Sequence, residues 1–124
     1  KTRARTCSIE RTKMQIKISK AKPYQINFSI ARIKYPEARI DANGWITVSD
    51  GTTFLIPDYC NDWDKTMKLA KEKGLLIDCA RTSEDNYRVA YRAVDNTEFT
   101  SVGKNLIRTV LRCYLMAELK SDFL

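Results

Sequence analysis

Apolar residues in this chain switch repeatedly between the spacing of a β-strand and the spacing of an α-helix. Residues 14–18 alternate apolar and polar side chains, which predicts a half-buried strand. From Pro23 to Lys34, isoleucines recur three and four residues apart, and a proline is well tolerated in the first turn of a helix. We therefore expect a helix over these residues that ends at Tyr35, because a residue before proline is disfavoured in the α region.

Two pairs of strand-like runs follow this first helix. Residues 45–48 and 53–56 flank Asp50-Gly51, and an Asp-Gly pair between two such runs is a strong hairpin signal. Residues 75–80 and 87–94 flank the polar stretch 82–86 in the same way. The sequence therefore predicts two β-hairpins.

Two further helices are expected, one between the hairpins and one at the end of the chain. The middle helix is predicted to be capped by Asn61 and to run to Lys73, with Gly74 just past its end. Its expected inner stripe is Trp63, Met67 and Ala70. The last helix is predicted over about Ser101 to Lys120, with a broad apolar face that suits packing across a sheet.

This order of elements predicts an α+β fold. We expect an antiparallel sheet of four or five strands, built from the two hairpins and the N-terminal strand and covered by three helices. A length of 124 residues fits one domain, which we place at residues 14–124. Residues 1–13 are interpreted as a basic arm or extension, either natural to the protein or added upstream of Met14.

The net charge of +7 raises the hypothesis of nucleic-acid binding, because lysine and arginine neutralise phosphates. Residues 1–13 supply +4 of this charge, so the rest of the chain is only moderately basic. Outside the arm, five basic residues are candidates for such a site: Arg88, Arg92, Lys104, Arg108 and Arg112. The first two share a face of a predicted strand beside tyrosines, and the last three recur every four residues. The alternative is that they only keep their elements solvated.

Catalytic chemistry finds little support in the composition. The chain contains no histidine, which removes the commonest general base and any Ser-His or Cys-His nucleophile. Its four glycines form no phosphate-binding loop. Three acids, Asp58, Asp62 and Asp64, have the residue type of a metal site, but acids at a helix start more often cap it. We therefore predict no enzyme activity, no cofactor and no metal.

The four cysteines are Cys7, Cys60, Cys79 and Cys113. Their spacing is long and irregular, so neither a zinc site nor a disulfide framework is expected. We interpret them as reduced and mostly buried thiols. No apolar run is long enough to span a bilayer, and the N-terminus lacks a signal-like segment. The expected location is therefore the cytoplasm, without membrane association.

Two stretches resemble small phage and prophage proteins of the NinX type. Residues 24–31, YQINFSIA, are similar to the opening helix of that family, and residues 56–62, IPDYCND, are similar to the corner before its middle helix. Asn105-Leu106-Ile107-Arg108, leading into the last helix, completes the likeness over roughly residues 20–120. The resemblance implies an α-β-α sandwich-like phage domain and names no reaction.

Two functions remain open from the sequence. The first is a non-enzymatic phage or prophage accessory protein that binds a host or phage macromolecule, such as a host-defence protein or another host factor. The alternative is a nucleic-acid-binding protein that uses the five basic residues and the arm. The sequence does not identify a partner.

Overall fold

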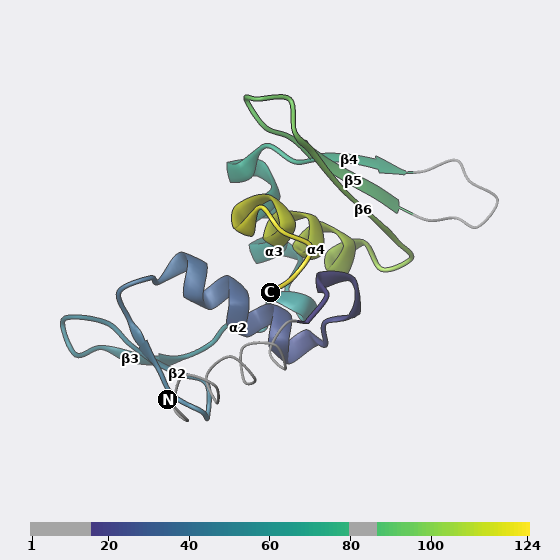
Figure 1. Cartoon of the computed structure of the whole chain (residues 1–124). Coiled ribbons are helices and arrows are strands. Elements are labelled where there is room, and N and C mark those ends of the chain that lie inside the picture. The colour runs from purple at the N-terminus through teal and green to yellow at the C-terminus, as the bar shows by residue number, and fades with distance from the viewer. Residues whose placement is uncertain (1–15, 80–86) are drawn as a thin grey trace, which may run out of the picture.

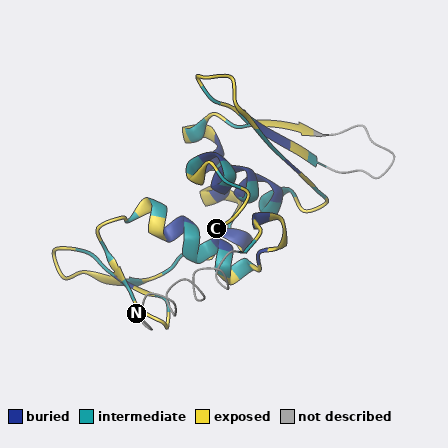
Figure 2. Cartoon of the chain, in the orientation of Figure 1, coloured by how far each residue is buried: buried dark blue, intermediate teal, exposed yellow. Residues whose placement is uncertain are grey.

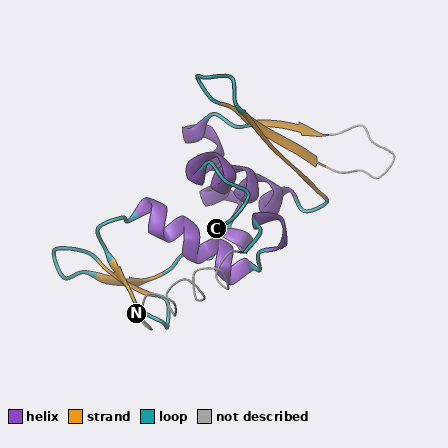
Figure 3. Ribbon diagram, viewed as in Figure 1, coloured by secondary structure: helices purple, strands orange, loops and turns teal. Residues whose placement is uncertain are grey.

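The structure, a computed structural model, describes residues 16–79 and 87–124 and has an α+β fold. Within these ranges it contains three α-helices, two short 3-10 helices and two separate three-stranded antiparallel sheets (Figures 1 and 3). The predicted class is therefore confirmed, whereas the single shared sheet is wrong. Residues 1–13, Met14 and the turn at 82–86 lie outside the described residues.

The elements follow one another in a simple order. They are η1 (Ile18–Lys20), α2 (Pro23–Lys34), β1 (Arg39–Ile40), β2 (Trp45–Thr47), β3 (Thr53–Leu55), η2 (Tyr59–Asn61), α3 (Trp63–Lys73), β4 (Leu76–Cys79), β5 (Tyr87–Arg92), β6 (Glu98–Gly103) and α4 (Leu106–Leu119).

Helix α2 has the bounds that its sequence predicts. It begins at Pro23, and the side-chain oxygen of Gln25 accepts a hydrogen bond of 2.8 Å from the backbone N–H of Lys22. Ile26 and Ile30 are fully buried on its inner side. These isoleucines pack α2 against the core, and other residues of the helix remain at the surface.

The predicted N-terminal strand is not formed by the described part of residues 14–18. Lys17 makes only an isolated antiparallel bridge with Phe123, and the chain turns into the 3-10 helix η1 at Ile18. The backbone of this segment pairs with the C-terminus instead, through bonds from Ile18 N to Asp122 O and from Leu124 N to Ile16 O. Only one short stretch of pairing is possible before the turn, so no sheet strand develops.

The first hairpin is confirmed, and a third strand joins it. Strands β2 and β3 pair from Trp45↔Leu55 to Thr47↔Thr53, and Gly51 takes the positive φ of +91° that the turn requires. The short strand β1 pairs with the other edge of β2. This sheet therefore has the order β1-β2-β3.

The second sheet also gains a strand that the sequence interpretation missed. Strands β4 and β5 form the predicted pair, and β6 continues the sheet along the other edge of β5. Residues 101–103 were predicted as the start of the last helix but belong to β6. Helix α4 begins only after Asn105, whose side-chain oxygen accepts a 3.0 Å bond from Arg108 N. As a result, Val102 is 54% exposed on the sheet and does not face a helical core.

The two sheets remain separate because each hairpin pairs locally while helices occupy the space between them. Figure 1 shows β1-β2-β3 beyond α2 at one end and β4-β5-β6 beyond α4 at the other. Helix α4 lies in the middle and buries most of its surface, as Figure 2 shows. One core cluster joins α4 to α2, η1 and η2, and a second joins it to α3 and β5.

Helix α3 ends at Lys73 with Gly74 just past it, as predicted, and the expected inner residues Met67 and Ala70 pack in the second core cluster. The cap and the position of Trp63 differ from expectation. Asp62, rather than Asn61, caps the helix by accepting a 3.0 Å bond from Lys65 N. Trp63 is 52% exposed because it is the first helical residue and projects past the end of the core. The buried stripe is Thr66, Leu69 and Ala70.

Gly103 provides a test of how closely β6 packs on α4. A Cβ atom added at this position would lie 2.8 Å from Oγ1 of Thr109, which is fully buried. We expect Gly103→Ala to lower the free energy of unfolding by about 1–3 kcal/mol through this steric conflict. Urea unfolding should show that Gly103→Ala with Thr109→Ala loses less than the sum of the two single variants, whereas additive losses would contradict the close packing.

Candidate functional site

The five predicted basic residues do not form one surface. Arg88 and Arg92 are exposed on β5, on the face that looks away from α4, whereas Tyr91 on the opposite face packs against the α3–α4 cluster. Arg92 is also ion-paired with Glu98 at 3.6 Å. Lys104 is exposed and precedes α4, so it does not share the helix with the two following arginines.

Arg108 and Arg112 are brought together, as their spacing predicts. They lie one turn apart on α4 and are both half-buried. The Nε atom of each is buried and has no hydrogen-bond partner among the described residues. Desolvation lowers the pKa of Arg112, and the neighbouring charge of Arg108 lowers it further. This basic pair therefore holds two partly desolvated positive charges side by side.

The corner at η2 is organised by an asparagine that the sequence interpretation did not select. Asn27 of α2 donates from Nδ2 to Oδ1 of Asp58 at 2.9 Å, and its Oδ1 accepts from the backbone N–H of Cys60 at 3.2 Å. Asn61 donates to the other carboxylate oxygen of Asp58 at 2.7 Å. These bonds, that of Asn61 first, lower the pKa of Asp58.

The three acids considered as metal ligands have separate positions and roles. Asp58 accepts bonds from two amides, Asp62 caps α3, and Asp64 is exposed in the first turn of that helix. No group of three potential ligands that could hold a metal ion occurs within residues 16–79 and 87–124. Asp58 and Asp62 therefore act here through hydrogen bonds that order η2 and α3.

Two of the cysteines are buried thiols in the described structure. Cys60 Sγ donates to the carbonyl oxygen of Pro23 at 3.6 Å, and Cys113 Sγ donates to that of Phe99 at 3.5 Å. Burial raises the pKa of Cys60, against the lowering effect of Arg108, and raises the pKa of Cys113 to about 12. Cys7 lies outside the described residues.

Slow alkylation of both buried thiols is the expected consequence. Only the thiolate reacts readily, so iodoacetamide near about pH 8 should label Cys60 and Cys113 much more slowly in the folded protein than after denaturation. Peptide mass spectrometry of a time course measures each site separately. Equal rates in the folded and denatured protein at Cys60 would show that it is a reactive surface thiol.

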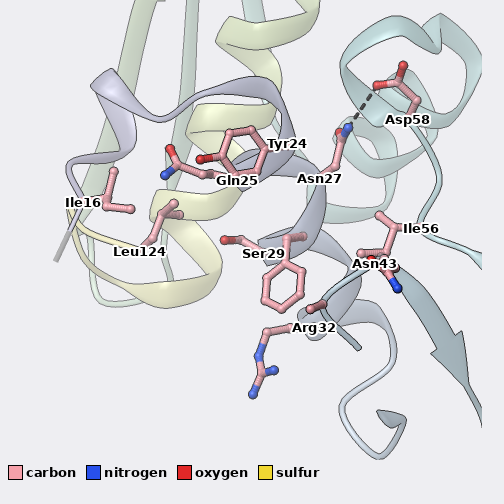
Figure 4. A pocket seen from close by; sticks show the side chains of 13 residues that line it. Ile16, Tyr24, Gln25, Asn27, Ser29, Arg32, Asn43, Ile56, Asp58 and Leu124 are labelled. Carbon is pink, nitrogen blue, oxygen red and sulfur yellow. Dashed lines mark hydrogen bonds between the residues drawn. The ribbon is translucent and has the colours of Figure 1, made fainter. Parts of the chain in front are cut away.

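A groove with a cavity volume of about 1030 Å³ opens beside α2. Figure 4 shows its wall on α2, with Ile56 and Asn43 on one side and Ile16 and Leu124 on another. The last two residues are held together by the 2.9 Å bond from Leu124 N to Ile16 O. The groove is thus assembled from α2, the β1–β2 turn, the end of β3 and both ends of the described chain.

The lining of the groove is mostly apolar, with polar groups at intervals. Tyr24 is 66% exposed on its rim, and the guanidinium of Arg32 lies 5.7 Å from the centre of the Phe28 ring. Asn27 lines the groove and also holds Asp58, so the η2 corner forms part of its wall. The sequence interpretation missed this site, although Tyr24 and Phe28 lie off the isoleucine stripe of α2 and were the available signal.

In the part of the chain that the structure describes, no helix combines the length and the apolar character needed to cross a bilayer.

The fold is similar to that of a phage protein from Bacillus cereus ATCC 14579, known from a crystal structure. The two structures agree with a TM-score of 0.65 over 82% of this chain and 90% of that chain, at 16% sequence identity. At this identity the likeness shows the fold alone. No protein-family model matches the sequence, and no curated protein matches it either. The likeness to phage proteins is therefore found at the level of the α+β fold, without assignment to the NinX-type family.

Proposed function

We propose that this protein is a non-enzymatic accessory protein of phage or prophage type that acts by binding a host or phage protein. The observation that carries the proposal is the open groove beside α2 (Figure 4), whose lining is largely apolar and whose rim carries an exposed tyrosine. Apolar grooves with a few polar groups at fixed positions are typical binding sites, and tyrosine and arginine are typical anchors of protein interfaces.

The chemistry of the groove favours a segment of a partner protein that is apolar and acidic. Its aromatic and aliphatic residues suit apolar side chains, and the amides of Gln25, Asn27 and Asn43 lie among them. Arg32 has no ion-pair partner among the described residues, whereas the Asp58 carboxylate accepts hydrogen bonds from two side-chain amides. Together with the net charge of +7, this arrangement complements an acidic partner.

Nucleic-acid binding remains the alternative proposal. It is supported by the basic composition and by the proximity of Arg108 and Arg112. It is less well supported as a continuous track, since Arg88 and Arg92 lie on the outer face of the second sheet and Arg92 is already paired.

The test compares three forms of the protein against one partner. The partner is captured from phage-infected cells, purified, and titrated against the wild type, a groove variant (Tyr24→Ser with Arg32→Glu), and the control Leu76→Ser, which removes an apolar residue that is 70% exposed on the other sheet. We expect the groove variant to raise the Kd at least about tenfold, which is the effect expected when one interface anchor is lost. The control should leave the Kd unchanged.

Equal Kd values for the groove variant and the wild type would contradict binding through the groove. A parallel titration with single- and double-stranded DNA and RNA at two salt concentrations tests the alternative. Steeply salt-dependent binding that is lost in Arg108→Ala with Arg112→Ala would favour nucleic acid as the partner.

A further inference from the structure

We propose that Arg108 and Arg112 form a site for a phosphoryl oxyanion, held between their two guanidinium groups on the side of α4 next to η2. Neither arginine lines the groove, and the site does not depend on the function proposed above. It would bind one phosphate group, either a phosphodiester of a nucleic-acid backbone or the phosphate of a free nucleotide.

Each of the two arginine side chains has a shielded Nε atom without a compensating partner in the described part of the chain. Both Nε atoms are buried and unpartnered within the described residues, and neither arginine forms an ion pair with a described carboxylate. A buried polar group normally has a hydrogen-bond partner, and a shielded charge without one is costly. The shielded Nε atoms are themselves closed to an external acceptor, but both arginines are only half-buried, so the remaining N–H groups of the two guanidiniums would hold a ligand that supplies acceptors.

The nearest described carboxylate in this neighbourhood makes no ion pair with either arginine. The charges of Arg108, Arg112 and Asp58 all act on the thiol of Cys60, so all four groups lie in one neighbourhood. The carboxylate of Asp58 accepts from Asn27 and Asn61 instead of from either guanidinium. Burial raises the pKa of Cys60, so its thiol stays neutral. An external anion would thus meet two cations, and the one described carboxylate of this neighbourhood is hydrogen-bonded to amides and not to either guanidinium.

Arginine is the side chain best suited to bind a phosphoryl group. A guanidinium offers a planar set of donors that matches two oxygens of a phosphate, and it stays charged when partly desolvated. Two guanidiniums one turn apart repel each other in the free protein, and this repulsion adds to burial, the larger cause, in lowering the pKa of Arg112. A dianionic or monoanionic phosphoryl group placed between them would remove this repulsion and fill the donor positions.

A purely structural role makes a different prediction. If the arginine stems served only to cover apolar surface, their replacement by methionine would remove a charge while keeping most of the packing volume. In that case phosphate would not stabilise the wild-type protein, and the methionine substitutions would have no phosphate response to remove. The test therefore measures stability and anion response together in the full chain.

Thermal unfolding is compared in potassium phosphate and in potassium chloride of the same pH and ionic strength. We expect phosphate to raise the Tm of the wild type, by about 5 °C when its concentration is tenfold above the Kd. Arg112→Met and Arg108→Met should lose this rise, and in chloride their Tm should equal or exceed that of the wild type because a repelling charge has been removed. The matched control Arg88→Met, an exposed arginine on the second sheet, should keep the phosphate response.

The source of the phosphate is decided by fluorescence anisotropy with a labelled single-stranded oligodeoxynucleotide and with a labelled nucleoside triphosphate. Tighter binding of the oligonucleotide assigns the site to a nucleic-acid backbone, and tighter binding of the triphosphate assigns it to a free nucleotide. Either outcome supports the site if Arg112→Met weakens the binding of that probe. The proposal is overturned if phosphate leaves the wild-type Tm unchanged, or if the methionine variants retain the full response. Either result leaves the groove proposal untouched.

Discussion

Replacing Leu111 by alanine is expected to lower the free energy of unfolding by about 2–5 kcal/mol. Leu111 is fully buried in the cluster where α4 meets α2 and η2, among residues that include Ile30 and Tyr59. Its truncation removes apolar contacts from three elements at once, and close-packed neighbours refill such a space only in part. Urea unfolding followed by circular dichroism measures the loss.

The control for this variant is Leu76→Ala. Leu76 is 70% exposed on β4, so the same chemical change should cost less than about 1 kcal/mol there. Similar losses for the two variants would show that α4 is not the centre of the core, and the arrangement of two sheets around it would have to be revised.

The second large effect is expected at Asn27, because this side chain joins α2 to the η2 corner. Asn27→Ala removes the bond to Asp58 and leaves the backbone N–H of Cys60 without its partner, which should cost about 1–3 kcal/mol. Asn61→Ala removes only one exposed bond to Asp58 and should cost about 0.5–1.5 kcal/mol. Stability is measured by urea unfolding, and the Cys60 amide by NMR.

The same pair of variants reports on the pKa of Asp58. Both asparagines lower this pKa, so the carboxylate stabilises the fold above its ordinary pKa and this contribution is lost as the pH falls through the folded value. Either alanine variant should move the titration of Asp58 toward the ordinary value of 3.8. If Asn27→Ala costs no more than Asn61→Ala and leaves the Cys60 amide unshifted, Asn27 does not organise the corner.

Local signals in the sequence predict those parts of the fold that local interactions decide. Pro23 and Tyr35-Pro36 define both ends of α2, and Asp50-Gly51 defines the first hairpin. Strand β6 was missed because Val102 continues the four-residue spacing of apolar residues in α4, while the pairing with β5 is a longer-range interaction. The separation of the two sheets depends on how three helices pack, which spacing along the chain does not encode.

The candidate sites show the same division. The spacing of Arg108 and Arg112 places them on one helix face, which the structure bears out, but Lys104 precedes the helix and the shielding of the pair arises from tertiary packing. The groove draws on segments as distant as Ile16, Asn43 and Leu124, so no continuous motif marks it. The role of Asn27 depends on its contact with the distant η2 corner, so the local sequence of α2 does not reveal it.

Site-specific photo-crosslinking gives the most direct test of binding through the groove. A benzoylphenylalanine is placed at Ser29, which lines the groove, or at Ser49, which is exposed next to the hairpin turn outside it. After irradiation in phage-infected cells, the Ser29 form should crosslink to one defined protein, and Tyr24→Ser with Arg32→Glu should abolish the product, while the Ser49 form should give none. The same product from both positions, or a product from Ser29 that survives the groove substitutions, would contradict the account.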